Sequence, residues 1–274
     1  MRRHHAARAT VAVVVALSLA ALGRPVQAQD IPSARELAEL RARAEAGDAQ
    51  AEYSLGLMYD TGRGVPQDYA EALRWYRLAA EQGHIEAQHQ LGRMYHRGRG
   101  VPQDFPEAVA WYRQAAEQGY VEAQYAVGWM YDIGIVGDVS PSDPTAPGVV
   151  EAVAWYRQAA EQGYVEAQHK LGRMYHQGRG VPQDFAEAVA WYHRAAQQGL
   201  PQALWFLGDM YSDGLGVPQD FVEAHKWYNL AASRLTADQR AEAATDRDAV
   251  AVQMTPVDLS EAQRRAREWY AERR

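Results

Sequence analysis

Two pairs of histidines are the residues whose types are best suited to hold a metal ion. His89 and His96 lie seven positions apart, and His169 and His176 repeat that spacing. On a helix this spacing separates the side chains by two turns, about 10.5 Å along the axis, whereas two ligands of one ion are typically about four positions apart. The pairs also lie in nearly identical stretches of sequence, so their recurrence reflects duplication. A metal site is therefore the less favoured interpretation, and we predict none.

The other residues that could support catalysis do not form a recognisable motif. The Gly-Arg-Gly loops resemble phosphate-binding loops, but they lack the Gly-Lys-Ser/Thr ending and no strand is expected before them. The chain has no cysteine, no Ser-x-x-Lys and no Gly-x-Ser-x-Gly, and its only lysines are Lys170 and Lys226. Carboxylate pairs such as Asp68 and Glu71 are explained by helix capping. We therefore predict a protein that is not an enzyme and that binds no cofactor.

The elements that must position any binding residue come from an internal repeat. One block of sequence occurs unchanged at residues 107–124 and 151–168, and the stretches 84–119 and 164–199 share 28 of 36 positions. Such self-similarity is the signature of a repeat architecture. The period, with steps of 36, 36, 44 and 36 residues, is marked by Gly56, Gly92, Gly128, Gly172 and Gly208.

The sequence pattern of each repeat predicts two helices. The first contains Leu-Gly-x-Met-Tyr and ends at a loop of glycine and proline such as residues 62–68. The second begins at an N-cap such as Asp68, with Glu71 three positions on, and ends at a glycine such as Gly83. Alanines and an aromatic pair form one stripe on the second helix. We predict that the tryptophans of this stripe lie in the core, namely Trp75, Trp111, Trp155, Trp191 and Trp227.

These residues carry a family resemblance. The run Leu-Gly-x-Met-Tyr, Gly-x-Gly-Val-Pro-Gln-Asp, Glu-Ala-x-x-Trp-Tyr, Ala-Ala and Gly resembles the Sel1-like repeats, relatives of the tetratricopeptide repeats, over about residues 48–232. The resemblance implies an all-α fold, a right-handed superhelical solenoid of helix-turn-helix repeats. The third copy departs from the pattern, because Gly148 stands where the capping Asp is expected. We expect residues 138–148 to form a mobile surface loop that can be shortened without unfolding.

The predicted organisation follows from the repeats and the two ends of the chain. We predict a signal peptide at 1–28, an N-terminal helix or cap at 29–47, five repeats within 48–233 and C-terminal capping helices at 234–274. The repeats span 48–83, 84–119, 120–163 with an insertion at 132–148, 164–199 and 200–232.

The first 28 residues have the features of an export signal. Arg2, Arg3 and Arg8 precede an apolar run of 15 residues, and Val26 and Ala28 supply small residues for cleavage. The alternatives are a twin-arginine signal and an uncleaved anchor. A helix of that run would span only about 22 Å of a bilayer core of about 30 Å, which favours cleavage. We expect an exported bacterial protein, periplasmic or secreted, with no membrane insertion after cleavage.

The net charge and the absence of cysteine limit the classes of partner and of covalent modification that the chain can have. The signal carries four arginines and no acidic residue, so the net charge of −7 becomes −11 in the mature chain. An acidic surface disfavours nucleic acid or an anionic membrane as the main partner. Without cysteine, a lipid-anchored N-terminus and disulfides are both excluded.

A binding surface is predicted on the first helices, which the resemblance places along the concave face. Relative to the repeat glycine, positions −2, +1 and +5 differ most among the copies, and they share one helical face. We predict a protein or peptide ligand, acidic or mixed in charge and with an apolar anchor. The alternative is that these positions are merely solvated. The predicted partner-binding residues are Trp129, Arg93, Arg173, Arg97, Ile133, Lys170 and Phe206.

The predicted function is that of a non-catalytic interaction scaffold or regulator in the cell envelope. By family analogy, periplasmic Sel1-like proteins that restrain sensor kinases are a precedent. Some cysteine-rich members have been associated with β-lactam hydrolysis, but this chain has neither their disulfide framework nor a serine motif. The alternative function is an envelope enzyme or a protein that binds cell-wall glycan or peptidoglycan.

Overall fold

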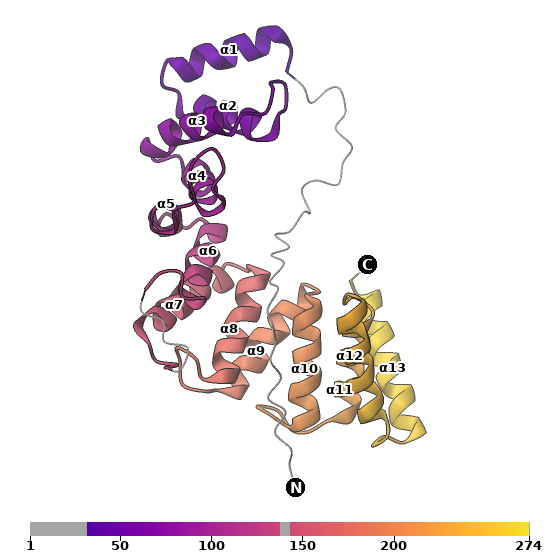
Figure 1. The fold of residues 1–274 in the computed structure, drawn as a ribbon. Helices are drawn as coiled ribbons and strands as arrows, with labels where there is room; N and C mark the ends of the chain where they lie inside the picture. Colours follow the sequence, from indigo (N-terminus) through magenta and orange to yellow (C-terminus); the bar gives the residue numbers. More distant parts are fainter. Residues whose placement is uncertain (1–31, 138–142, 274) are drawn as a thin grey trace.

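The structure, a computed structural model, describes residues 32–137 and 143–273 (Figure 1). These residues form thirteen helices and no strand, which confirms the predicted all-α repeat fold. The predicted signal peptide, residues 1–28, lies outside the described residues. The helices are α1 Ala34–Glu45, α2 Ala49–Thr61, α3 Tyr69–Glu81, α4 Ile85–Arg97, α5 Phe105–Glu117, α6 Val121–Asp132, α7 Pro147–Glu161, α8 Val165–Gln177, α9 Phe185–Gln197, α10 Pro201–Asp213, α11 Phe221–Ala232, α12 Ala237–Ala251 and α13 Pro256–Ala271.

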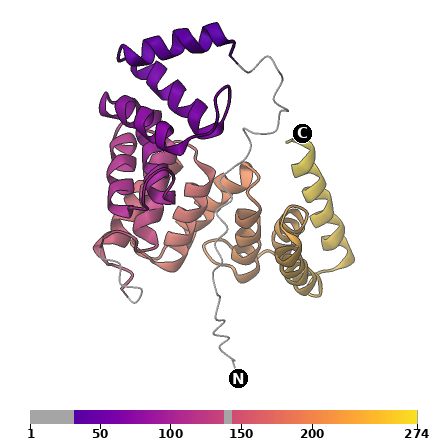
Figure 2. The same ribbon diagram turned by 45° about the horizontal axis from the view of Figure 1, so that its top comes forward.

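The helices pack as successive hairpins that form a curved array. Each first helix packs on the second helix of its own repeat and on that of the repeat before it, from α2 to α11. The array bends between α1 at one end and α13 at the other (Figures 1 and 2). The first helices lie on the inner side of this bend, most clearly α4 and α6, and we call that side the inner face.

Short polar contacts set where the second helices begin. The carboxylate of Asp68 accepts hydrogen bonds from the backbone N–H groups of Ala70 and Glu71 at 2.9 and 3.1 Å. The equivalent caps of α5, α9 and α11 each accept a hydrogen bond from the backbone N–H three positions on, as predicted, at Asp104, Asp184 and Asp220. In the third repeat α7 begins instead at Pro147, with no side-chain cap.

The insertion of the third repeat is packed at its C-terminal end. The backbone N–H of Gly180 donates to the carbonyl of Pro144 at 2.7 Å, so the segment contacts the loop of the next repeat. Ala146 is only 2% exposed, and Gly148 is buried inside α7. The expected mobile loop over 138–148 is therefore wrong for its last residues, because Ala146 is buried and Pro147 and Gly148 belong to α7. Residues 138–142 lie outside the described part.

A close contact between glycine and tyrosine joins the two helices of every repeat. A Cβ atom at Gly92 would lie 2.7 Å from the Tyr112 ring, closer than packed carbons approach each other. The tyrosine ring is buried, and it occupies the space that any larger residue would need. The same pairing recurs at Gly56 with Tyr76, Gly128 with Tyr156, Gly172 with Tyr192 and Gly208 with Tyr228.

Four of the five predicted core tryptophans are buried. Trp75, Trp155, Trp191 and Trp227 are each no more than 8% exposed. Trp111 is half-buried and packs at the edge of the apolar core, so this copy fits the prediction only in part. Its indole N–H donates to the carboxylate of Glu107 at 2.9 Å, a polar contact at the helix surface.

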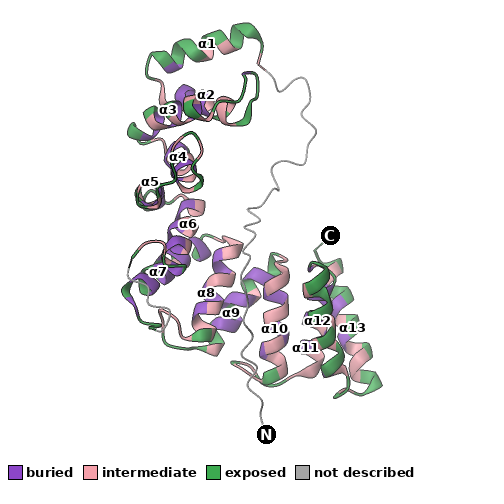
Figure 3. Cartoon of the chain, viewed as in Figure 1, coloured by how far each residue is buried: buried purple, intermediate pink, exposed green. Residues whose placement is uncertain are grey.

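The two ends of the array are covered, as a solenoid requires. At the N-terminal end α1 packs Ala44 against Leu55 and Trp75 of the first repeat. At the C-terminal end Ala266 and Trp269 of α13 join the apolar cluster of the last repeat. Figure 3 shows buried residues along the joints between helices, whereas α1 is largely exposed.

No helix in the described residues is both long enough and apolar enough to cross a bilayer.

The glycine–tyrosine contact generates the first prediction. Gly92→Ala should lower the free energy of unfolding by about 1–3 kcal/mol, because the added methyl forces α4 away from the Tyr112 ring. Chemical denaturation followed by circular dichroism measures this loss. Ala110→Ser, on the exposed face of α5, is the control and should change stability by less than about 0.5 kcal/mol. Equal stability of the two variants would contradict the proposed constraint.

Candidate partner-binding face

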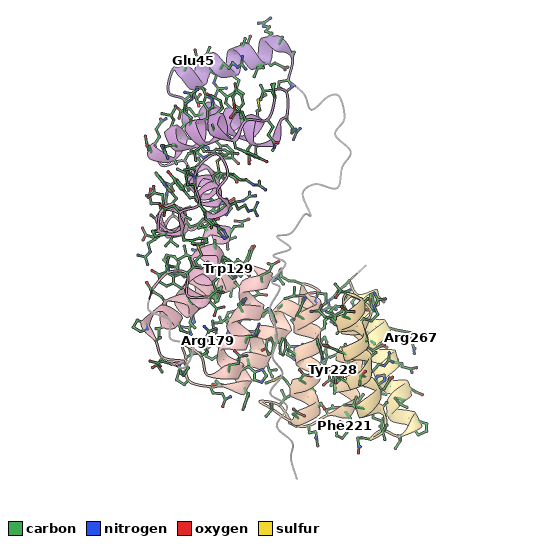
Figure 4. The ribbon with its side chains drawn as sticks, in the orientation of Figure 1. Glu45, Trp129, Arg179, Phe221, Tyr228 and Arg267 are labelled. Atoms are coloured by element: carbon green, nitrogen blue, oxygen red, sulfur yellow. The ribbon has the colours of Figure 1, made fainter. Side chains whose placement is uncertain are left out.

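The structure places the predicted partner-binding residues on four successive first helices. Trp129 lies on the inner side of the bend, on α6 (Figure 4). Repeat equivalence puts the other residues on neighbouring helices of the same face, with Ile133 directly after α6. The rest are Arg93 and Arg97 on α4, Lys170 and Arg173 on α8 and Phe206 on α10.

Trp129 is both a core and a surface residue. Its side chain is half-buried and packs against the apolar clusters on either side of the third repeat. The indole also lies next to His96, with ring centroids 5.4 Å apart. Beside it Ile133 is 47% exposed. The two side chains therefore offer an apolar surface at the centre of the inner face, but only part of the indole is free.

The arginines of α4 form a positively charged patch. The guanidinium of Arg93 donates to the side-chain oxygen of Gln90 at 2.8 Å, while its buried Nε has no partner. In the described part of the chain neither Arg93 nor Arg97 forms an ion pair with a carboxylate. Burial, followed by the positive charges of Arg93 and Arg99, lowers the pKa of Arg97. The patch therefore holds like charges together, and the charge of Asp60 opposes their effect on Arg97 only in part.

Another arginine without an ion pair among the described residues lies on α8. Arg173 is half-buried, its Nε is buried without a partner, and among the described residues it forms no ion pair. Burial, with a contribution from the nearby charges of Arg173 and Lys170, lowers the pKa of His169 to about 3. His176 on the same helix has a lowered pKa from burial and from Arg173. Both imidazoles are therefore neutral at physiological pH and add no charge to this face.

Two of the predicted binding residues already have partners within the protein. The ammonium of Lys170 lies 3.3 Å from a carboxylate oxygen of buried Asp132, which Arg179 also binds through a carboxylate oxygen and the backbone carbonyl. The ring of Phe206 stacks on Tyr192, with centroids 5.1 Å apart and planes 8° from parallel. These contacts join neighbouring repeats, so Lys170 and Phe206 have structural roles.

A row of rings on the inner face was missed by the sequence analysis. It lies three positions before the repeat glycine, where every copy carries an aromatic residue or histidine, whereas the sequence comparison examined variable positions. Tyr53 stacks on His84 of the next repeat at 4.6 Å, and Tyr125 packs on Tyr164 at 5.1 Å. The members of the row are Tyr53, His89, Tyr125, His169 and Trp205.

The histidine pairs take part in this ring packing. His89 lies between Tyr112 and Tyr120, while His96 packs against Phe105 and Trp129. In residues 32–137 and 143–273 no three side chains of histidine, aspartate or glutamate converge as metal ligands would.

The sequence matches the Sel1 repeat at residues 49–84, 85–120, 121–164, 165–200 and 201–234. The chain belongs to the Sel1 repeat family. This match confirms the resemblance inferred from the repeat motif. Sel1 repeats generally form protein-interaction scaffolds, and the fold is typically non-catalytic.

The chain is also similar to several solved structures. A Sel1 repeat protein from Oxalobacter formigenes is 33% identical, with a TM-score of 0.63 over 75% of this chain and 87% of that one. A protective antigen present in uropathogenic Escherichia coli strains is 28% identical, with a TM-score of 0.44 over 85% and 63%. An immunity protein from Pseudomonas aeruginosa is 20% identical, with a TM-score of 0.40 over 82% and 81%. No curated protein matches the sequence significantly.

The buried histidines of this Sel1 repeat protein generate a prediction about pH. The pKa of His89 and that of His169 are each lowered to about 3, mainly by burial. The unfolded chain takes up these protons near pH 6.5, so the stabilising effect of the neutral rings is complete above that pH and is lost as the pH falls toward 3. Each histidine should contribute up to about 1.4 kcal/mol of lost stability per pH unit in that window.

Urea unfolding at pH 7 and pH 5 measures the effect. The test variant is His89→Tyr with His169→Tyr, because tyrosine occupies the same position at Tyr53 and Tyr125. The double variant should lose less stability than the natural chain between the two pH values, and each single variant should lie between them. An identical loss in all four proteins would show that these histidines are not responsible.

Proposed function

We propose that the protein binds a partner protein or peptide on its inner face, at the first helices of repeats two to four. The observation that carries this proposal is a set of arginines that form no ion pair among the described residues, Arg93, Arg97 and Arg173, on a chain whose net charge is −7. Although the protein is acidic, no carboxylate in the described part of the chain forms an ion pair with these three guanidinium groups.

The chemistry of this face favours a partner segment with carboxylates and an apolar side chain. A guanidinium group with unused donors can hold a carboxylate through two parallel hydrogen bonds. The exposed part of Trp129, with Ile133 beside it, offers an apolar contact between the arginines of α4 and Arg173 of α8. Tryptophan and arginine are also the residues most enriched among those that dominate binding energy at interfaces.

We further propose that the protein is exported and acts in the cell envelope as a non-catalytic adapter or regulator. The basic start, the short apolar run and the small residues before Gln29 support export. The generally scaffolding role of Sel1 repeats supports binding rather than catalysis. The competing function, recognition of cell-wall glycan, would use the same aromatic face and is an outcome of the binding test below.

The export proposal predicts a mature chain that begins at Gln29. N-terminal sequencing of the protein recovered from the periplasmic or extracellular fraction checks the cleavage position. A variant that lacks the apolar run should stay in the cytoplasm. Recovery of intact residues 1–28 in the membrane fraction would show an uncleaved anchor instead.

The binding proposal predicts a partner that can be crosslinked from the inner face. A photo-crosslinking residue at position 129 of the full chain should capture one protein in the cells that make it. The same residue at position 110, on the exposed outer face of α5, is the control and should not. Peptidoglycan fragments are tested in parallel against the purified chain. Capture at both positions, or binding of the fragments alone, would count against the proposal.

Affinity for the captured protein then tests the named residues. Trp129→Leu should weaken binding by about 2 kcal/mol or more, because the indole contact is lost. Leucine occupies the same position at Leu57, so stability should fall by less than the about 3–5 kcal/mol expected for the buried Trp155→Ala. Arg93→Glu and Arg173→Glu should slow association and reduce its dependence on salt. Unchanged affinity in all three variants would refute the proposed face.

A further inference from the structure

A cleft of about 560 Å³ lies at the C-terminal end of the solenoid, between α11, α12 and α13. It is separate from the inner face of repeats two to four, so the inference below does not depend on the proposed function. Arg267, on α13 in Figure 4, marks one of its walls. The polar residues that line the cleft are His225, Asn229, Arg247, Asp248, Gln263 and Arg267.

The cleft lies where the loop of a further repeat would lie. In the preceding repeats the second glycine of the loop packs against the start of the previous second helix, as Gly216 does on the backbone of Phe185. The equivalent residue of the last repeat is Phe221, one turn before His225. Only residues 252–255 connect α12 to α13, and this connection contains no glycine. The first turns of α11 are therefore not covered by such a loop, and the space remains open.

The floor of the cleft carries a residue that packing does not explain. His225 is 5% exposed, and its Nδ1 is buried without a hydrogen-bond partner. Burial and the positive charge of Arg247 lower the pKa of its imidazole. A buried polar atom without a partner is destabilising, and an aliphatic side chain would fill the position. The four preceding repeats do place an aliphatic residue there, at Leu73, Val109, Val153 and Val189.

The walls depart from the repeat pattern as well. In the third repeat Arg157 donates to the hydroxyl of Tyr175 on the next first helix, at 2.6 Å. At the end of the last repeat Asn229 stands in the position of Arg157, and Arg247 stands in the position of Tyr175. The hydrogen bond between repeats is therefore absent at this position, and the side chain of Arg247 lines the cleft instead. Among the described residues Arg247 forms an ion pair only with its neighbour Asp248, at 2.7 Å, and that carboxylate is 67% exposed.

The facing wall adds a second arginine. Among the described residues Arg267 forms neither a hydrogen bond nor an ion pair with another side chain. The cleft therefore combines two guanidinium groups from different helices with the amides of Asn229 and Gln263, above a buried imidazole. Its one carboxylate lies at the rim, toward solvent.

We propose that this cleft binds a small anion that carries carboxylate or phosphate groups. Guanidinium groups match the planar oxygen pairs of both, and the two amides can donate to the remaining oxygens. The volume is in the range of about 300–1,000 Å³ that is typical of small-molecule sites. The ligand would lie against α11, α12 and α13 together and so join the cap to the last repeat.

Isothermal titration calorimetry on the exported full-length protein tests the proposal. The probes are inorganic phosphate and succinate, each titrated at constant ionic strength in chloride, and they distinguish the two kinds of anion. Arg267→Gln and Arg247→Gln should each weaken binding about tenfold. Arg264→Gln is the matched control on α13, because Arg264 pairs with Glu261 and Glu268 away from the cleft, and it should leave affinity unchanged.

His225→Val provides a second, structurally conservative test. It installs the residue type of the preceding repeats, so the variant should fold as the natural protein does and bind the anion more weakly. Saturable binding of either probe that is weakened by the cleft variants and not by Arg264→Gln supports the proposal. Absence of saturable binding by both probes, or equal weakening by Arg264→Gln and Arg267→Gln, overturns it.

Discussion

The contact between a glycine of the first helix and a tyrosine ring of the second is the constraint on which the rest of the array depends. Because no side chain projects from Gly92 or its equivalents, the ring can lie directly against the helix backbone. The close approach sets the distance between the two helices of a hairpin, and alanines on the facing stripe keep it small. Once every hairpin has this geometry, stacking identical units produces a regular bend, and the first helices come to share its inner face.

Most of the fold could be predicted from the sequence because its determinants are local. The repeat period, the Asp caps and the glycine helix ends each depend on a few adjacent residues, and all appear in the structure. The exceptions depend on distant partners. Trp111 is half-buried although its four equivalents are buried, and the insertion of the third repeat accepts a hydrogen bond at Pro144 from Gly180 of the fourth. The sequence pattern within a single repeat does not indicate contacts with residues of another repeat.

In the candidate site, too, the residue types could be predicted from the sequence, but their contacts with distant residues could not. The sequence identified which positions vary on the inner face, but not which of their charges are already neutralised. Lys170 pairs with Asp132 across 38 positions, whereas Arg173, three residues further along, forms no ion pair within the part of the chain that the structure describes. The row of rings that begins at Tyr53 was overlooked because the sequence comparison examined only the positions that differ most among the copies. In the structure that row forms part of the inner face.

The buried ion pairs of Asp132 distinguish the interface between the third and fourth repeats. Each repeat contacts mainly its neighbours in the array. A force applied at the two ends is therefore shared as a small rotation at each interface between repeats. At the joint between the third and fourth repeats, Arg179 and Lys170 both hold one carboxylate that is 6% exposed, and rotation there would break charged contacts in a poorly hydrated place. We expect this joint to resist rotation more than a joint without a buried ion pair would, so that bending concentrates on either side of it.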